Sequence, residues 1–183
     1  MIIVGLVTAC GNSNEETASE SLSTDNTDLS PSDSNAEVTD QMELEIGDTA
    51  TIESTIGTYE ITLNDMQYHE EIEGEISDLE IYLIADYTLR NVGEEDISAV
   101  ESTTTLELTD YLDGSGQPDT AGAFENIDYF SDDQLKPGDK VHGQAVYNSY
   151  DADTFYVRAV QGLVASGGLK NDVLFTIEKE EME

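Results

Sequence analysis

The sequence predicts an all-β fold: an antiparallel β-sandwich of about seven or eight strands, preceded by an acidic N-terminal segment. Short segments alternate apolar and polar residues at period two, which is the pattern of strands with one buried face. Gly- and Asp-rich turns separate these segments, and no segment has a sustained helical period. Short, regular strands joined by such turns are typical of two antiparallel sheets packed together.

The first group of predicted strands extends from residue 42 to residue 68. Its apolar positions are, in chain order, Met42, Leu44, Ile46, Ala50, Ile52, Tyr59, Ile61 and Leu63. After Leu63 the parity shifts by one residue, and Met66 and Tyr68 hold the next apolar positions. A β-bulge near Asn64 and Asp65 would absorb this shift, because a bulge adds one residue to a strand.

The strongest strand pattern extends from Leu79 to Val92. Its first six odd positions are all apolar, whereas the opposite face is mixed and includes Arg90. We therefore predict a central strand of a packed sheet at these residues. The acidic residues 70–78 before it predict a loop or a loose hairpin.

The C-terminal half of the chain predicts four more strands. They cover residues 103–109 (with Leu106 and Leu108 facing inward), 140–147 and 154–160, and a last segment with Val173, Phe175 and Ile177. Loops fill the intervals, including the turn-rich residues 110–119 and the small-residue stretch from Gly162 to Gly168. A short helix between Ala121 and Asp133 is an alternative to a loop there.

The only cysteine, Cys10, ends an apolar run that begins at Ile2 and closes with Val7-Thr8-Ala9. An aliphatic residue, two small residues and a cysteine resemble the lipobox of bacterial lipoproteins, in which the cysteine is lipidated and becomes N-terminal. The resemblance implies a signal peptide at residues 1–9 and a lipid anchor on Cys10. The run departs from the usual signal peptide because it is short and no Lys or Arg precedes it. The alternative is that Cys10 is a small residue in a buried apolar segment.

Residues 10–40 have the composition of a spacer. They are rich in Ser, Thr, Asn, Asp and Glu, contain no aromatic residue and hold only isolated apolar side chains. Such a segment cannot bury enough apolar surface to offset its chain entropy, so we expect it to be disordered. The folded domain is then predicted at residues 41–180.

The charge of the chain restricts its partners. The sequence holds 41 acidic and 6 basic residues, which gives a formal net charge of −35. This excludes nucleic acid, because neutralising phosphates requires Lys and Arg, and it disfavours electrostatic docking on anionic lipids. Cations, basic proteins, polycationic polymers and neutral glycans remain. From residue 41 onwards 33 acidic and 6 basic residues are left, and we expect this domain to need salt or divalent cations to screen its self-repulsion.

Three sequence pieces, at residues 47–65, 82–93 and 135–143, resemble a known family. The second piece ends a long strand with Asn91-Val-Gly93, and the third opens with the turn Leu135-Lys-Pro-Gly138. With the lipobox and the spacer, they are similar to the uncharacterised immunoglobulin-like domain of Gram-positive lipoproteins, related to telokin-like secreted antigens. The resemblance covers residues 42–180 and implies an immunoglobulin-like sandwich outside the cytoplasmic membrane. It brings no catalytic residues with it.

Two sets of polar residues are candidate ligand sites. Asp110, Asp113 and Asp119 could bind Ca²⁺, which takes about six to eight oxygen ligands, but their spacing is not that of an EF-hand. The alternative is that aspartates occupy this loop because their side chains stabilise turns. His69 and His142 could be metal ligands or general bases, yet neither has a second His or a Cys at ligand spacing. Ordinary strand residues are the alternative for both.

The aromatic residues divide into two groups. Tyr59, Tyr87 and Phe175 have the parity of core residues. The other candidates, some of which we expect to be exposed, are Tyr82, Tyr111, Tyr129, Tyr147, Tyr150 and Tyr156. Exposed tyrosines could form a binding surface, and pairing across strands is the alternative.

These observations lead to an expected function. We expect a monomeric cell-surface lipoprotein with a non-catalytic binding, adhesion or accessory module, anchored to the outer face of the membrane by a lipid on Cys10. Its ligand would be a protein or a glycan that the sequence does not identify. The alternative is an envelope protein that binds Ca²⁺ through acidic loops. An envelope enzyme is a third reading, because opposed carboxylates depend on a geometry that spacing does not reveal.

Overall fold

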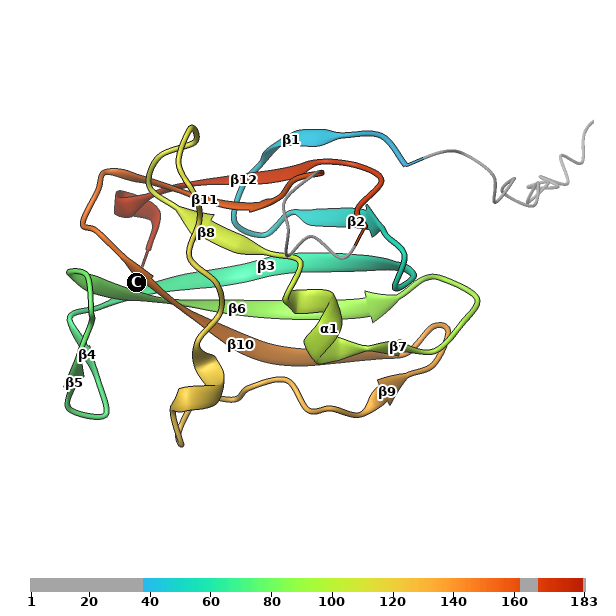
Figure 1. Cartoon of the computed structure of the whole chain (residues 1–183), viewed down its shortest axis with the longest axis horizontal. Coiled ribbons are helices and arrows are strands. Elements are labelled where there is room, and N and C mark those ends of the chain that lie inside the picture. The colour runs from blue at the N-terminus through green and yellow to red at the C-terminus, as the bar shows by residue number, and fades with distance from the viewer. Residues whose placement is uncertain (1–37, 162–167, 183) are drawn as a thin grey trace, which may run out of the picture. The chain divides into compact units, whose positions relative to one another are not determined.

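The computed structural model describes residues 38–161 and 168–182, which form two four-stranded sheets packed face to face (Figure 1). One sheet has the spatial order β1 (Gln41–Leu44), β12 (Val173–Glu178), β11 (Thr154–Ala159) and β8 (Glu107–Thr109). The other has the order β10 (Lys140–Ser149), β6 (Ile81–Asn91), β3 (Thr58–His69) and β2 (Thr49–Glu53). Neighbouring strands are antiparallel, except that β1 and β12 are parallel. The predicted all-β, immunoglobulin-like sandwich is thus confirmed.

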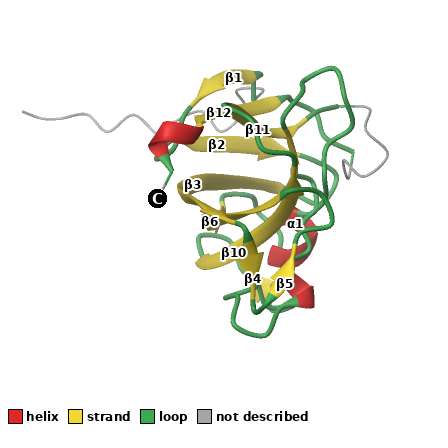
Figure 2. Ribbon diagram, turned by 90° about the vertical axis from the view of Figure 1, so that its left-hand side faces the viewer, coloured by secondary structure: helices red, strands yellow, loops and turns green. Residues whose placement is uncertain are grey.

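Short elements decorate the two sheets (Figure 2). Two small ribbons pair β4 (Glu71–Ile72) with β5 (Glu75–Ile76) and β7 (Ile97–Ser98) with β9 (Gln134–Leu135). The helical turns are α1 (Ala99–Thr103) and the 3-10 turns η1 (Ala121–Ala123) and η2 (Lys179–Glu181). No helix in the described ranges is long and apolar enough to cross a membrane. The predicted signal peptide, Cys10, nearly all of the spacer and residues 162–167 lie outside the described residues.

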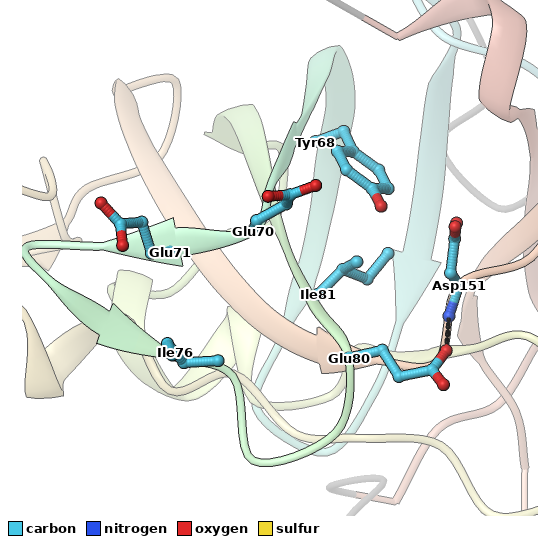
Figure 3. A pocket seen from close by; sticks show the side chains of 7 residues that line it. All are labelled: Tyr68, Glu70, Glu71, Ile76, Glu80, Ile81 and Asp151. Carbon is cyan, nitrogen blue, oxygen red and sulfur yellow. Dashed lines mark hydrogen bonds between the residues drawn. The ribbon is translucent and has the colours of Figure 1, made fainter.

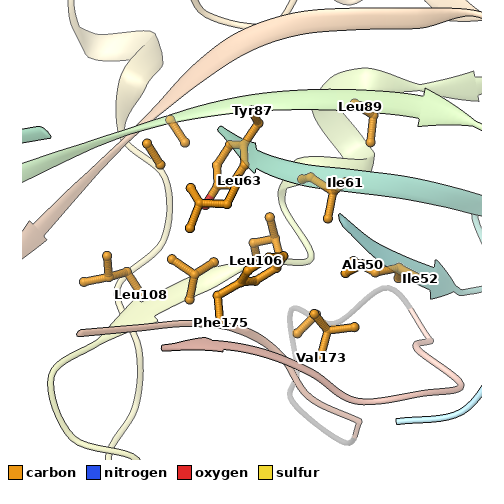
Figure 4. Packing of buried hydrophobic residues seen from close by; sticks show 14 of the residues in the cluster. Ala50, Ile52, Ile61, Leu63, Tyr87, Leu89, Leu106, Leu108, Val173 and Phe175 are labelled. Atoms are coloured by element: carbon orange, nitrogen blue, oxygen red, sulfur yellow. The ribbon is translucent and has the colours of Figure 1, made fainter. Parts of the chain in front are cut away.

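The main core lies between the two sheets. Figure 4 shows Leu63 and Tyr87 on one side of it and Leu108 and Phe175 on the other. Burying one such side chain contributes about 1.5–3 kcal/mol, so the shared cluster holds the sheets together. The predicted inward positions Ala50, Ile52, Tyr59, Ile61, Leu63, Leu106, Leu108, Val173, Phe175 and Ile177 are all buried. Met42 is 46% exposed, and it lies where the register between β1 and β12 shifts, between Gln41 and Leu44.

The predicted β-bulge is present in β3. The register with β6 shifts between Leu63, which lies opposite Tyr87, and Asp65, which lies opposite Asp86. Asn64 is the extra residue and is exposed to solvent. The bulge moves Met66 onto the buried face, which explains the shift in parity of the sequence.

Strand β6 is central, as predicted, and it is buried on both faces over its first half. The odd residues face the main core, while Tyr82 and Ile84 on the other face belong to a second apolar cluster. Residues of η1 and the β4–β5 hairpin cover this cluster, and Tyr82 and Phe124 pack edge to face with ring centroids 5.5 Å apart. Tyr82 and Ile84 are therefore buried, although the sequence mixes apolar and polar residues on their face of β6.

The predicted strand at residues 103–109 is wrong in its first half. Only Glu107–Thr109 is a strand, and α1 ends at Thr103. The Ser98 hydroxyl accepts a hydrogen bond from the backbone N–H of Glu101 and caps this helix. The threonine hydroxyls that suggested a strand turn back onto backbone carbonyls, for example Thr105 Oγ1 onto Ser102 O at 2.7 Å.

The tyrosines end up in distinct environments. Tyr59 is fully buried, and its hydroxyl donates to Ser102 O and lies 2.8 Å from Thr105 Oγ1. Tyr87 and Tyr147 are also buried, with their hydroxyl oxygens 3.4 Å apart, and burial raises the pKa of both. Tyr111 and Tyr150 are exposed. Of the six tyrosines among which we expected some exposed side chains, Tyr82 and Tyr147 are therefore buried.

The edge strands of the β2–β10 sheet are covered by other parts of the chain. The side-chain amide of Gln41 donates to Thr51 O at 2.7 Å and accepts from Thr51 N at 3.1 Å. Asn171 Oδ1 accepts from Glu53 N at 2.9 Å on the same strand, β2. At the opposite edge, Gln144 N of β10 donates to Asp128 O at 2.7 Å. Occupied edges of this kind hinder pairing with a second chain.

Candidate functional site

The three predicted calcium ligands, Asp110, Asp113 and Asp119, have different surroundings in the structure. Asp110 directly follows β8, and Asp113 accepts a hydrogen bond from the hydroxyl of Tyr111 at 3.1 Å. Asp119 Oδ1 accepts from the backbone N–H groups of Ala121 at 2.8 Å and Val146 at 2.9 Å. Burial raises the pKa of the Asp119 carboxyl, although these two hydrogen bonds oppose the shift.

The structure does not gather these aspartates into a cation site. Within residues 38–161 and 168–182, no group of three or more His, Cys, Asp or Glu side chains is arranged to hold a metal ion. The two histidines contact neutral neighbours. His69 Nε2 lies 3.4 Å from Gln67 Oε1, and His142 Nδ1 lies 2.9 Å from Thr88 Oγ1.

A buried arginine holds the loop that carries Asp113. Arg158 of β11 donates from Nε to Glu107 Oε1 at 2.7 Å and from its two terminal nitrogens to Leu112 O and Gly114 O, each at 2.6 Å. The loop passes so close to Glu107 that a Cβ added at Gly116 would lie 2.5 Å from the Glu107 carboxyl carbon. Arg158 thus supplies the positive charge at the base of this acidic loop.

The family-like motifs meet at one corner of the sandwich. Asn91 ends β6, is fully buried, and donates from Nδ2 to Leu135 O and Glu95 O, each at 2.8 Å. Its Oδ1 accepts from Gly93 N at 2.9 Å, and its backbone carbonyl accepts from Gly138 N. The Asn-X-Gly and Leu-X-Pro-Gly motifs therefore contact each other directly, and their hydrogen bonds join the end of β6 to the turn before β10.

The candidate site lies at the other end of β6. It is an open pocket of about 550 Å³ lined by Tyr68, Glu70, Glu71, Ile76, Glu80, Ile81 and Asp151 (Figure 3). These residues come from the end of β3, the β4–β5 hairpin, the start of β6 and the turn between β10 and β11. The antiparallel pairing of β3, β6 and β10 brings these ends together, because consecutive antiparallel strands alternate in direction.

The pocket combines an apolar surface with a carboxylate rim. Ile81 is buried, and Ile76 is 75% exposed. Four of the seven lining residues are acidic, and Glu80 Oε2 accepts a hydrogen bond from the backbone N–H of Asp151 at 2.9 Å (Figure 3). Such a surface can bind a group that is both cationic and partly apolar.

One lysine of the chain borders this pocket. Lys179 Nζ of η2 donates to Asp151 Oδ1 at 2.6 Å and lies 4.4 Å from the centroid of the Tyr68 ring. The hydrogen bond to Asp151 raises the pKa of Lys179. The ammonium thus contacts two of the pocket residues.

Sequence reasoning predicted the elements around the pocket but not the pocket itself. Residues 70–78 were expected as an acidic loop or loose hairpin, and the structure forms the β4–β5 hairpin there. Nothing in the spacing relates this hairpin to Asp151 or Lys179, which lie far along the chain. The sequence does distinguish Lys179, because it is a single basic residue between Glu178 and Glu180, and this could have marked it as a residue with a specific contact.

Comparisons with known proteins relate the chain to solved structures. No protein-family model matches the sequence, and no curated protein matches it. MPT63, a secreted protein of Mycobacterium tuberculosis, is similar with a TM-score of 0.54 and 13% identity, over 75% of this chain and 97% of MPT63. A candidate lipoprotein of Bacillus subtilis, ycdA, is similar with a TM-score of 0.50 and 14% identity, over 71% of this chain.

The match spans 39% of the ycdA chain, so this chain corresponds to less than half of that protein. The yjhA protein of Bacillus subtilis aligns with a TM-score of 0.45 and 18% identity, over 74% of this chain and 99% of yjhA. Because these sequence identities are low, the similarity shows only that this chain shares its fold, the immunoglobulin-like sandwich, with MPT63 and ycdA.

Proposed function

We propose that this protein is an extracytoplasmic, non-catalytic binding module, tethered to the outer face of the cell membrane by a lipid on Cys10. The observation that carries the binding role is the open pocket at the start of β6, where Tyr68 and Ile81 are combined with four carboxylates. Open pockets with an apolar surface and a few convergent polar groups are the usual sites of ligand binding.

The extracytoplasmic location has two supports. Val7-Thr8-Ala9-Cys10 resembles a lipobox. The shared fold occurs in MPT63, a secreted protein, and in ycdA, a candidate lipoprotein. We propose on this basis that the chain belongs with the uncharacterised immunoglobulin-like domains of Gram-positive lipoproteins.

The non-catalytic role is proposed from the family resemblance, which brings no catalytic residues with it, and the four carboxylates of the pocket are assigned to ligand binding. The contacts along the edges of β2 and β10 favour a monomer, because they hinder pairing of this sheet with a second copy.

The anchor is tested by replacing Cys10 with Ser in a Gram-positive host. We expect the wild-type protein in the membrane fraction with a diacylglyceryl mass on Cys10, and Cys10→Ser in a soluble fraction. Ser13→Ala, three residues further along, is the control and should stay with the membrane. Equal membrane retention of Cys10→Ser and wild type, or an unmodified Cys10 in native material, would contradict the proposal.

A further inference from the structure

A row of polar side chains crosses the outer face of the sheet formed by β10, β6, β3 and β2 (Figure 1). Each strand contributes one residue to this threonine row, and neighbours in the row are register partners: Thr49, Thr62, Thr88 and His142. The row faces away from the core, because Tyr87, next to Thr88, lies in the core and side chains alternate along a strand. Thr49 and His142, at its two ends, are exposed to solvent.

Hydrogen bonds link the threonine row from strand to strand. Thr49 Oγ1 lies 2.7 Å from Thr62 Oγ1, and Thr88 Oγ1 lies 2.9 Å from His142 Nδ1. Each hydroxyl has one donor and two acceptor sites, so the bond between Thr49 and Thr62 leaves part of their capacity free. The row thus presents polar groups to solvent at the spacing of the strands, about 4.7–4.9 Å.

The β-bulge of β3 adds an amide to the same face. Asn64, the extra residue, reaches across to β6, where its Nδ2 donates to Asp86 Oδ1 at 2.7 Å and to Thr88 Oγ1 at 3.0 Å. Bulges often redirect a side chain beside a functional site. The bulge is an observation independent of the row, and it directs a further hydrogen-bonding group to the row.

The charge around the threonine row differs from that of the rest of the chain. On one side of the row Arg90 lies opposite Lys140 and forms an ion pair with Glu60 at 3.3 Å. On the other side Asp65 lies opposite Asp86. Two bases thus accompany three acids here, whereas the whole chain holds 41 acidic and 6 basic residues. A nearly neutral surface in so acidic a protein complements a neutral ligand better than a cationic one.

The side chains of this face favour a glycan among neutral ligands. They are hydroxyls, amides, an imidazole and charged groups, and the exposed large apolar residues of the described ranges all lie elsewhere. Protein partners bind mainly through aromatic and other large anchors, which these positions do not provide. Sugar hydroxyls both donate and accept hydrogen bonds, so they match the side chains of threonine, asparagine and histidine.

We infer that the threonine row binds a neutral glycan, whose sugar units lie across the strands and exchange hydrogen bonds with Thr62, Thr88 and Asn64. This inference goes beyond the pocket of the proposed function, because it adds a second binding surface on the other half of β6. Binding through a few exposed hydrogen bonds is weak, so we expect a dissociation constant in the millimolar range.

The probes are tri-N-acetylchitotriose and maltotriose, two neutral glycans with and without acetamido groups. Each is added to the isotope-labelled full-length protein in a non-ionic detergent that carries no sugar. NMR should show saturable shifts of the amide resonances of Thr62, Thr88 and His142 with at least one probe. Thr62→Val combined with Thr88→Val keeps the β-branched shape and removes both hydroxyls, so binding should weaken about tenfold.

The matched control is Thr154→Val combined with Thr176→Val. These threonines alternate with the buried Phe155 and Phe175, so they lie on the outer face of the other sheet. We expect less than a twofold effect, with the folding of all variants checked by circular dichroism. Equal weakening by the two double variants would overturn the inference, because binding would then not depend on the threonine row.

A comparison of ligands provides a measurement that needs no variant. Tetraserine with blocked ends carries hydroxyls but no sugar rings, and it should cause no saturable shift. The inference would be overturned by equal binding of tetraserine, by no saturable shift with either glycan, or by shifts confined to residues outside this sheet face. Each of these failures would leave the membrane anchoring measured with Cys10→Ser unaffected, so the two proposals fail separately.

Discussion

At the scale of single residues, a few buried polar side chains fix how segments distant in the sequence meet. Asn91, Asn171 and Arg158 are each almost fully buried, and each bonds to the backbone of another segment. A backbone carbonyl or N–H that loses such a partner inside the protein pays its full desolvation cost, about 1–3 kcal/mol. These residues therefore matter more to stability than their number suggests.

Asn91 gives the sharpest prediction at this scale. Asn91→Ala should lower the free energy of unfolding by about 3 kcal/mol, because it removes the partners of Leu135 O, Glu95 O and Gly93 N. Urea unfolding monitored by circular dichroism measures this change. Asn64→Ala, which removes only solvent-exposed hydrogen bonds to Asp86 and Thr88, is the control and should cost about 1 kcal/mol or less. Equal unfolding midpoints for the two variants would contradict the role given to Asn91.

At the scale of elements, the β4–β5 hairpin acts as a clasp. Its turn residues Glu73 and Gly74 both have positive φ, 55° and 83°, as two-residue hairpin turns that match the strand twist require. Glu73 Oε1 accepts from the backbone N–H of Asn126 at 2.6 Å, and Oε2 accepts from that of Glu125 at 3.2 Å. The clasp holds the loop after η1 over Tyr82 and the second apolar cluster.

The hydrogen bonds between the Glu73 carboxylate and the loop after η1 should be lost at acidic pH. The hydrogen bond from Asn126 N, followed by that from Glu125 N, lowers the pKa of Glu73 below its ordinary 4.5. A lowered carboxyl pKa means that the folded protein binds this proton less readily than the unfolded chain does. The contribution of Glu73 to the stability of the folded state is therefore fully present above about pH 4.5, and it is lost as the pH falls through the lowered pKa. NMR should show the amide resonance of Asn126 shifting in this range.

Glu73→Ala should release the same loop at neutral pH, seen as faster hydrogen exchange at Asn126. Glu75→Ala, on the adjacent strand of the hairpin, is the control and should leave the exchange rate unchanged. Unaltered protection of Asn126 in Glu73→Ala would show that the apolar cluster alone holds the loop.

At the scale of the whole molecule, charge sets the conditions under which the domain is stable. The chain from residue 41 carries 33 acidic and 6 basic residues, and the structure describes ion pairs for Arg90, Arg158, Lys170 and Lys179. Most carboxylates are therefore balanced only by solvent ions, and compaction brings them closer together.

We expect the melting temperature to rise when NaCl increases from 10 mM to 1 M, because the Debye length falls from about 30 Å to about 3 Å. Differential scanning calorimetry measures the rise. CaCl₂ and MgCl₂ at matched ionic strength provide the control, since diffuse screening affects both alike and a specific calcium site would respond to Ca²⁺ alone. A melting temperature independent of NaCl would contradict the self-repulsion.

Period-two alternation determined much of the fold by itself. It located the central strand β6, the bulge at Asn64 and the inward faces of Phe175 and Leu108, because a strand side chain faces the core or the solvent according to its position in the pleat. This information is local, so one segment of sequence contains it.

Only the tertiary structure decided which segments meet. Residues 99–105 form a helix and a turn because the hydroxyls of Ser98 and the threonines make hydrogen bonds to nearby backbone groups. The hydroxyl of Tyr59, from β3, also donates a hydrogen bond to Ser102 O in this segment. The pocket exists because strand pairing brings Tyr68, Glu80 and Asp151 together and places Lys179 beside them. Such contacts join residues far apart in the chain, and periodicity carries no information about distance between segments. That is why the sequence could specify a β-sandwich, whereas the pocket emerged only from the fold.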